Sequence, residues 1–330
     1  MNPLLFKILK KVCSKGPISY RDFIELALYH PEVGYYTLNR RRVGRSQSSD
    51  FYTAESLGSV FSELVINAAR TLLKTDDLSS YHFVEIGAEP NSALIDSLAS
   101  NPFLKNSVVR PGDSLSLNDE ACILFANEWL DALPFHRLRF HEGTWRERAV
   151  LLNDQGILEE TYLEQLSPAL STSVQSLPQK ACQGYEIDLS PDVEMQINRL
   201  FDANWTGLLL LFDYGKTWNE LTEHMPNGSA RTYAQHRQGS DLFNSVGDCD
   251  ITFDICWDCI QEVLKKKHNL CSDLKSQEAF FVHYASQTIE RILSQSKFSI
   301  TREKSTLLEL IHPTNMGQKF QVLHALRKTD

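Results

Sequence analysis

The chain has 330 residues, of which 42% are hydrophobic and 23% are charged, and its net charge at pH 7 is −9. This composition is typical of a globular protein with enough residues for one large domain or two. The acidic balance argues against a nucleic-acid binder, and no segment is long and apolar enough to span a membrane. Seven irregularly spaced cysteines and a lysine-interrupted N-terminus without a signal peptide favour a cytoplasmic, reducing compartment.

Apolar residues at helical spacing predict three helices in the first part of the chain. One covers residues 4–13 and another covers residues 57–72. Between them, a helix begins after Ser19, which forms the pattern of a helix cap with Asp22 three residues later. We expect residues 1–75 to form a helical N-terminal region.

Short apolar runs that end in polar residues predict buried strands of a parallel sheet. They cover His82 to Ile86, Ala121 to Ala126, and Gly207 to Phe212, the last of which ends in Asp213. Because these strands alternate with predicted helices, the sequence indicates an α/β fold with its core in residues 76–330.

The polar residues after the second apolar run form a candidate site. Asn127, Glu128 and Asp131 follow the strand, and ligands of open α/β sheets bind beyond the carboxyl ends of strands. The same residues could simply cap a helix, with Asn127 as the N-cap and Asp131 in the first turn. This segment alone leaves both interpretations open.

The rest of the core is expected to hold a hairpin, a variable insert, loops and further elements. The hairpin pairs residues 137–140 with residues 148–152, the insert with some helix covers residues 153–190, and polar loops cover residues 216–250. The predicted helices are at residues 191–203, 254–265 and 277–293, and the predicted closing strands are at residues 298–301, 307–311 and 320–326.

Cys256 and Cys259 form a C-x-x-C pattern. A metal or redox site of this kind needs a second paired motif or a thioredoxin-like context, and the sequence shows neither. Together with Val263 these residues fit one face of a helix. We therefore expect the two cysteines to be packing residues, and no metal site.

Eight segments match, in order, a known protein family. They lie at residues 17–36, 50–53, 126–134, 145–148, 212–215, 231–236, 247–252 and 316–323. Through them the chain resembles the MidA-like family of class I S-adenosylmethionine-dependent methyltransferases, whose mitochondrial members are complex I assembly factors that methylate a protein arginine. The resemblance covers nearly the whole chain and implies a Rossmann-like, mostly parallel sheet with helices on both faces.

The resemblance implies S-adenosylmethionine as the cofactor. The residues it assigns to cofactor binding are Glu85, Gly87, Asn91, Asp113 and Asn127. The family turn reads acid-x-Gly-x-Gly-x-Gly, and here Glu85 and Gly87 match it. Glu89 and Asn91 replace the later glycines, and Pro90 stiffens the turn, which works against binding.

The region between Gly87 and Asn127 is also short compared with the family pattern. A βαβ crossover takes a dozen residues or more, so at least one of the family's strand–helix units is missing here. Asp113 is the nearby candidate for the acid that binds the cofactor ribose.

The family's acceptor is a protein arginine, and a guanidinium is oriented by paired carboxylates that also help it lose a proton. We expect Glu128 and Asp213 to contact the guanidinium, with Asp131 in support. His236 is a further candidate proton acceptor, although a lone loop histidine is more often a hydrogen-bonding scaffold. The alternative is that Asp131 caps a helix and that Asp213 braces a loop.

The resemblance also implies an acceptor cleft, with residues 1–75 as a helical lid region packed on the core and residues 216–250 as substrate-side loops. The residues it assigns to acceptor binding are Tyr35, Asp50, Thr53, Tyr214, Arg231 and Tyr233. Arg231 has the alternative of a structural ion pair. Asp254 stands where the family usually has a histidine.

Two functions follow from the resemblance. The chain is either an S-adenosylmethionine-dependent protein arginine methyltransferase or a catalytically inactive relative that acts as an assembly or scaffolding partner. The intact N-E-x-x-D segment at 127–131 favours the enzyme, whereas the altered glycine turn and the missing strand–helix unit favour the inactive relative.

Overall fold

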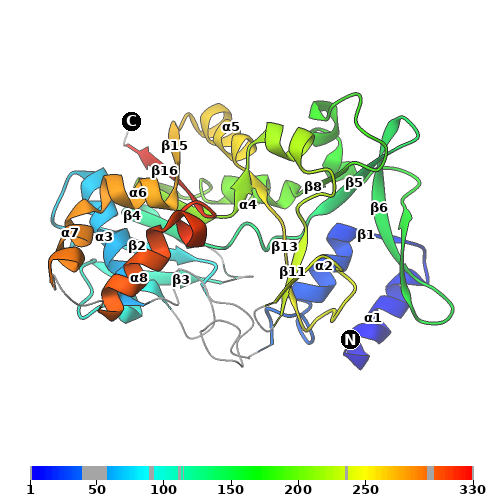
Figure 1. Cartoon of the computed structure of the whole chain (residues 1–330), viewed down its shortest axis with the longest axis horizontal. Helices are drawn as coiled ribbons and strands as arrows, with labels where there is room; N and C mark the ends of the chain where they lie inside the picture. Colours follow the sequence, from blue (N-terminus) through cyan, green and yellow to red (C-terminus); the bar gives the residue numbers. More distant parts are fainter. Residues whose placement is uncertain are drawn as a thin grey trace. The chain divides into compact units, whose positions relative to one another are not determined.

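The computed structural model describes residues 2–38, 58–88, 93–110, 113, 115–234, 237–295 and 301–328. The chain divides into two compact units, each made of three segments (Figure 1). Unit 1 comprises Met1–Phe51, Leu130–Gln196 and Gly215–Ile260. Unit 2 comprises Tyr52–Trp129, Ile197–Tyr214 and Gln261–Asp330. The expected functional division into residues 1–75 and 76–330 stays a prediction.

Unit 2 is built on a six-stranded sheet in the order β15-β16-β9-β4-β2-β3. Its strands are β2 (His82–Ile86), β3 (Lys105–Val109), β4 (Asn118–Asn127), β9 (Asn204–Asp213), β15 (Ser272–Ser276) and β16 (Gln321–Arg327). The pairs from β3 to β9 are parallel, while β16 and β15 join antiparallel. The expected α/β fold with a mostly parallel sheet is confirmed, and the three apolar runs lie in its adjacent central strands.

Four helices of unit 2 pack with the sheet in one apolar core. They are α3 (Ser59–Leu73), α6 (Gln277–Tyr284), α7 (Ser286–Ser294) and α8 (Arg302–Ile311), and Figure 1 shows them gathered beside the strands. Phe61 of α3 contacts Phe125 and Phe212, whose ring centroids lie 6.3 and 5.6 Å away. These aromatic rings join the helices to β4 and β9, which explains why the strands read as unbroken apolar runs.

Two predicted elements of unit 2 were wrong. The segment 307–311 belongs to helix α8, because Leu307 and Leu310 are buried three residues apart and Thr301 caps the helix by accepting from the Lys304 N–H. The predicted helix at 277–293 is two helices, α6 and α7, that break at Ala285. The predicted strand residues 298–300 lie outside the described residues.

The connection from β2 to β4 is short. Among the described residues it holds β3 and one 3₁₀ turn, η2 (Leu94–Ser97), but no α-helix. This agrees with the expected shortage of a strand–helix unit. In this region Leu117 lines a cavity of about 310 Å³ together with Val84 of β2 and Val109 of β3.

Unit 1 holds three smaller sheets. Five strands form the largest sheet, β1 (Ile18–Ser19), β5 (His136–His141), β6 (Thr144–Leu152), β7 (Leu158–Tyr162) and β8 (Glu186–Leu189). The others pair β10 (Gly215–Lys216) with β14 (Ile255–Cys256), and β11 (Arg231–Ala234) with β12 (Arg237–Gly239) and β13 (Asp250–Thr252). The predicted hairpin is confirmed as β5 and β6.

The insert at 153–190 contains strands in place of the expected helix. β7 and β8 extend the large sheet, and the helical parts are the short 3₁₀ turns η3 (Pro168–Leu170) and η4 (Ser173–Ser176). The remaining α-helices are α1 (Pro3–Cys13), α2 (Tyr20–Tyr29), α4 (Pro191–Arg199) and α5 (Trp257–His268). No helix in the described part of the chain has the length and apolarity needed to cross a membrane.

Buried ion pairs hold the large sheet of unit 1 together. Arg137 of β5 donates to Asp188 and Glu186 of β8, at 2.8 Å in each case. Arg148 of β6 donates to the same Glu186. Because a buried charge is costly unless it is paired, these residues fix the order of β6, β5 and β8.

Candidate functional site

Glu128 stands directly after β4 at the carboxyl edge of the parallel strands in unit 2. Its backbone N–H donates to the carbonyl of Phe212 in the neighbouring strand β9, at 2.9 Å. Its φ is +50°, in the left-handed region that costs a residue with a Cβ about 1–2 kcal/mol. Strain of this kind is often concentrated at functional sites, where the surrounding structure holds it in place.

Asp213 ends β9, next to Glu128, and its side chain is buried. One carboxylate oxygen accepts from the Trp129 N–H at 3.3 Å and the other from the Tyr214 N–H at 2.8 Å. The carboxylate therefore fixes the backbone after β4 and after β9. These contacts support the bracing alternative for Asp213, and its catalytic role stays a prediction.

Gly87 follows β2 at the same edge and has a φ of +79°. A Cβ added to Gly87 would lie 2.8 Å from Cδ1 of Trp129, so the indole occupies the side of the turn that only glycine leaves open. Glu85 is buried two residues earlier, and its carboxylate accepts from the Leu94 N–H at 2.7 Å. The altered residues Glu89, Pro90 and Asn91 lie outside the described residues.

Asn127 carries a buried polar atom that no described residue satisfies. Its Oδ1 is buried and has no hydrogen-bond partner among the described residues. Its Nδ2 donates to the Glu128 carboxylate at 3.1 Å, and since a carboxylate only accepts, this bond fixes which way the amide points. An unpaired buried acceptor costs about 1–3 kcal/mol, a cost that a ligand N–H or O–H would remove.

These residues fit the donor groups of S-adenosylmethionine. Its amino groups and hydroxyls are the donors that the Asn127 Oδ1 lacks, and the left-handed Gly87 keeps the one glycine of the family turn that lies in the described residues, with the Trp129 indole packed against it. Asp113 follows β3, the strand beside β2, which is the position expected for the ribose acid. It is exposed, and its carboxylate accepts from the Arg110 N–H at 2.9 Å.

Asp131 and Arg231 belong to an acidic and aromatic cluster in unit 1. Arg231 donates to Asp254 at 2.6 Å, which is the ion pair weighed as its alternative role. Asp131 is buried and acts electrostatically on Arg231 and on Tyr233. The Tyr233 hydroxyl donates to Gln238 at 3.1 Å.

Tyr35 and Tyr36 lie in the same unit. Tyr35 is fully buried, with its ring edge-on to Tyr36 at 5.1 Å. The Tyr36 hydroxyl donates to Asp250 at 2.7 Å, and burial, followed by the charge of Asp250, raises the pKa of Tyr36 well above its usual value of 10.0. This Tyr36–Asp250 contact was missed, although both residues lie in segments that carry the family resemblance.

The other predicted site residues divide into two groups. Tyr214 packs its ring on Phe320 in unit 2, with centroids 4.1 Å apart. Asp50, Thr53 and His236 lie outside the described residues, so their assigned roles stay predictions.

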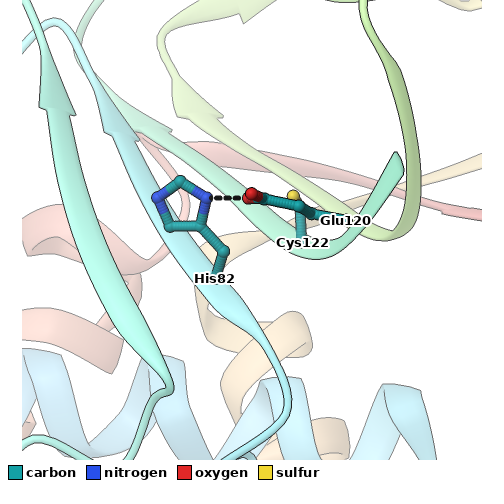
Figure 2. A group of neighbouring side chains, drawn as sticks. All are labelled: His82, Glu120 and Cys122. Atoms are coloured by element: carbon teal, nitrogen blue, oxygen red, sulfur yellow. Dashed lines mark hydrogen bonds and ion pairs between the residues drawn. The ribbon is translucent and has the colours of Figure 1, made fainter. Parts of the chain in front are cut away.

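A second polar cluster lies at the amino-terminal ends of β2 and β4, away from Gly87. Figure 2 shows His82 of β2 facing Glu120 and Cys122 of β4, and the three side chains offer ligand atoms within 4.8 Å of one another. Its polar contacts are already made, because His82 bonds to Glu120 at 2.6 Å and to Ser107 at 2.8 Å. Lys105 donates to the other Glu120 oxygen at 2.7 Å. The expected lack of a metal stays a prediction.

The sheet order and its glycine-containing carboxyl edge define a protein with the class I methyltransferase fold. Residues 61–274 match the model of a family described as "putative S-adenosyl-L-methionine-dependent methyltransferase". The chain belongs to this family.

Solved and curated relatives extend the similarity to nearly the whole chain. A Burkholderia thailandensis protein, named a "likely methyl transferase" and crystallised bound to S-adenosyl-homocysteine, is 20% identical with a TM-score of 0.84, over 99% of this chain and 92% of that one. The mitochondrial protein arginine methyltransferase NDUFAF7 of Homo sapiens is 21% identical over 97% of this chain and 82% of its own. Its Caenorhabditis elegans homologue is 22% identical over 98% and 86%.

Proposed function

We propose that the chain is an active S-adenosylmethionine-dependent methyltransferase whose acceptor is an arginine side chain of a protein. The observation that carries the proposal is the arrangement of Asn127 and Glu128 at the carboxyl edge of β4. Asn127 holds an unsatisfied acceptor suited to the cofactor, and next to it Glu128 holds a carboxylate suited to a guanidinium. The relatives named protein arginine methyltransferases support this acceptor class.

Gly87, Asn127 and Asp113 are the residues proposed to hold the cofactor. When bound, S-adenosylmethionine supplies a methyl group on a sulfonium, which is transferred by in-line displacement. Gly87 is proposed to shape the turn beside the ligand through its left-handed backbone, and Asn127 is proposed to accept a hydrogen bond from the ligand. Glu85 acts indirectly, because it holds the backbone of Leu94 at the far end of the turn.

Glu128 is proposed to orient the acceptor guanidinium and to take its proton. Its anchored backbone and its contact with Asn127 hold it at the end of β4. Asp213 is proposed as a positioning residue that fixes the backbone of Trp129 and Tyr214. The inactive alternative rested on the altered glycine turn and on the missing strand–helix unit, and no comparison with a relative supports it. The cytoplasmic location stays a prediction, and the curated relatives are named mitochondrial.

The test is methyl transfer with the full chain. The purified protein is incubated with methyl-labelled S-adenosylmethionine and a protein extract from cells depleted of arginine methylation, and labelled residues are identified by mass spectrometry. The proposal predicts methylarginine that is absent with Glu128→Gln and retained with the control Asp154→Asn, an exposed turn residue. Label on another residue type would contradict the acceptor class, and no label despite cofactor binding would contradict the activity.

A further inference from the structure

The C-x-x-C pair lies at the start of helix α5 in unit 1. Cys256 ends β14 and immediately precedes α5, and Cys259 lies in the first turn of the helix. Residues three apart on a helix have Cβ atoms about 5–6 Å apart, whereas a disulfide holds them about 3.5–4.5 Å apart. The two cysteines would therefore have to approach each other by about 1–2 Å for their sulfurs to bond.

The two thiols differ in exposure, which corrects the expectation that both are packing residues. Cys259 is exposed, while Cys256 is half-buried. The buried side of α5 is formed by Ile260 and Leu264 instead. The Cys259 thiol can therefore reach and attack a disulfide in solution, whereas the neighbouring Cys256 is shielded.

The contact between the thiols favours the same division of roles. The hydrogen bond to the Cys259 side chain, followed by burial, raises the pKa of the Cys256 thiol. Cys256 therefore keeps its proton and can donate it to the Cys259 sulfur. A neighbouring donor and a helix N-terminus both stabilise a thiolate, which is the reactive form of cysteine.

Other exposed cysteines lack this arrangement. Cys182 and Cys271 are also exposed, but neither has a second cysteine three residues away in the sequence. They are matched controls, because they share the solvent access of Cys259 without its partner.

The cysteine pair is tied to the backbone that follows the Asp213 strand. Cys256 pairs with Lys216 of β10, and Ile255 pairs with Gly215. The Trp257 indole closes on Gly215, where an added Cβ would lie 2.4 Å from the indole nitrogen. A covalent constraint at Cys256 therefore acts on the strand that begins two residues after Asp213.

We propose that Cys256 and Cys259 form a dithiol–disulfide exchange site that reacts with low-molecular-weight disulfides such as glutathione disulfide. The Cys259 thiolate attacks one sulfur of the small disulfide, forms a mixed disulfide and releases one thiolate, which takes up a proton. Cys256 then loses its proton to solvent and attacks the Cys259 sulfur, which releases the second thiol. The protein dithiol is oxidised by two electrons and one small disulfide is reduced to two thiols. This proposal does not depend on the proposed methyl transfer.

The test uses the full chain equilibrated with reduced and oxidised glutathione in varying ratio, then alkylated and mapped by mass spectrometry. Wild-type protein is expected to give a peptide with Cys256 and Cys259 joined, lighter by two hydrogen atoms. Cys256→Ser is expected to accumulate glutathione on Cys259, because the resolving thiol is gone. Cys182→Ser and Cys271→Ser are expected to leave the 256–259 disulfide unchanged.

A second measurement does not require any variant to fold. In the reduced wild-type protein, iodoacetamide at neutral pH is expected to modify Cys259 about ten-fold faster than Cys271, because only Cys259 has a neighbouring thiol and a helix N-terminus beside its sulfur. Equal rates together with no joined peptide in fully oxidised glutathione would overturn the proposal. So would a disulfide that forms only between other cysteines.

Discussion

The Trp129 N–H donates to the Asp213 carboxylate at 3.3 Å, which ties the chain after β4 to the end of β9. The Trp129 side chain also fills the space beside the Cα of Gly87, after β2. One residue thereby joins the carboxyl ends of three neighbouring parallel strands. The geometry of the proposed cofactor edge depends on these two contacts.

Asp213→Asn tests the bracing role. Asparagine keeps one acceptor but loses the charge and the second acceptor, so a backbone N–H of Trp129 or Tyr214 loses its partner. The expected loss in the free energy of unfolding is about 1–3 kcal/mol, measured by urea denaturation. Asp154→Asn, on the exposed surface, is the control. An unchanged free energy of unfolding would show that Asp213 does not brace these segments.

Gly87→Ala tests whether the space beside Trp129 matters beyond the backbone conformation. Gly143 has a similar φ of +81° with nothing within 4 Å of an added Cβ, so Gly143→Ala isolates the cost of the left-handed backbone. We expect Gly143→Ala to lower the free energy of unfolding by about 1 kcal/mol and Gly87→Ala to lower it by more, with weaker binding of S-adenosylhomocysteine. Equal losses would mean that the Trp129 contact adds nothing.

Two substitutions of Glu128 separate the effect of its backbone strain from the effect of its carboxylate. Glu128→Gly removes the strain of the left-handed backbone but raises the conformational entropy of the unfolded chain. The free energy of unfolding should therefore change by less than about 1 kcal/mol. Glu128→Gln keeps the shape and removes the base. Both variants are expected to lower kcat by about 100-fold or more in the methyl-transfer assay. Full activity of Glu128→Gln would rule out a catalytic carboxylate at this position.

The raised pKa of Tyr36 predicts how the free energy of unfolding changes at alkaline pH. Burial, then the charge of Asp250, raises the pKa of Tyr36, so above about pH 10 the unfolded chain loses a proton that the folded chain keeps. The stabilisation is complete below that pH and declines above it, by up to about 1.4 kcal/mol per pH unit. The midpoint temperature of thermal unfolding should therefore fall less steeply with rising pH for Tyr36→Phe than for wild type or for Tyr81→Phe. Parallel curves would contradict the prediction.

The cluster of His82, Glu120 and Cys122 is expected to act as a structural brace without a metal. Lys105 and Ser107 complete its hydrogen bonds, and burial, followed by the charge of Glu120, raises the pKa of Cys122 to about 12, so the thiol resists the deprotonation that a metal requires. Titration with Co²⁺ should give no thiolate-to-metal absorption band. A band that disappears with Cys122→Ala would establish a metal site here.

Much of unit 2 is predictable from local sequence. The buried strands β2, β4 and β9 are apolar runs because both of their faces are covered, and the glycine and acids that follow them mark one edge of the sheet. Segment 307–311 was assigned to a strand because a short apolar run does not distinguish strand from helix. The burial of Leu307 and Leu310 on one face identifies the segment as part of a helix.

The side-chain contacts of unit 1 were less accessible to sequence reasoning. The Tyr36–Asp250 bond spans 214 residues, and the pairing of Arg137 with Asp188 spans 51. Local pattern carries no information on which distant charges pair. The family resemblance identified the segments but not the contacts within them, which is why Asp250 was not assigned to the site and Arg231 was placed in it without its partner, Asp254.

The most direct test of the central claim is a calorimetric titration of the full chain with S-adenosylhomocysteine, followed by S-adenosylmethionine. The Asn127 oxygen, which has no partner among the described residues, and the left-handed glycine turn at Gly87 predict saturable binding with a dissociation constant in the micromolar range, weakened by Asn127→Ala. Absence of binding heat at millimolar ligand, for a chain shown to be folded, would contradict the assignment of this chain as a working methyltransferase.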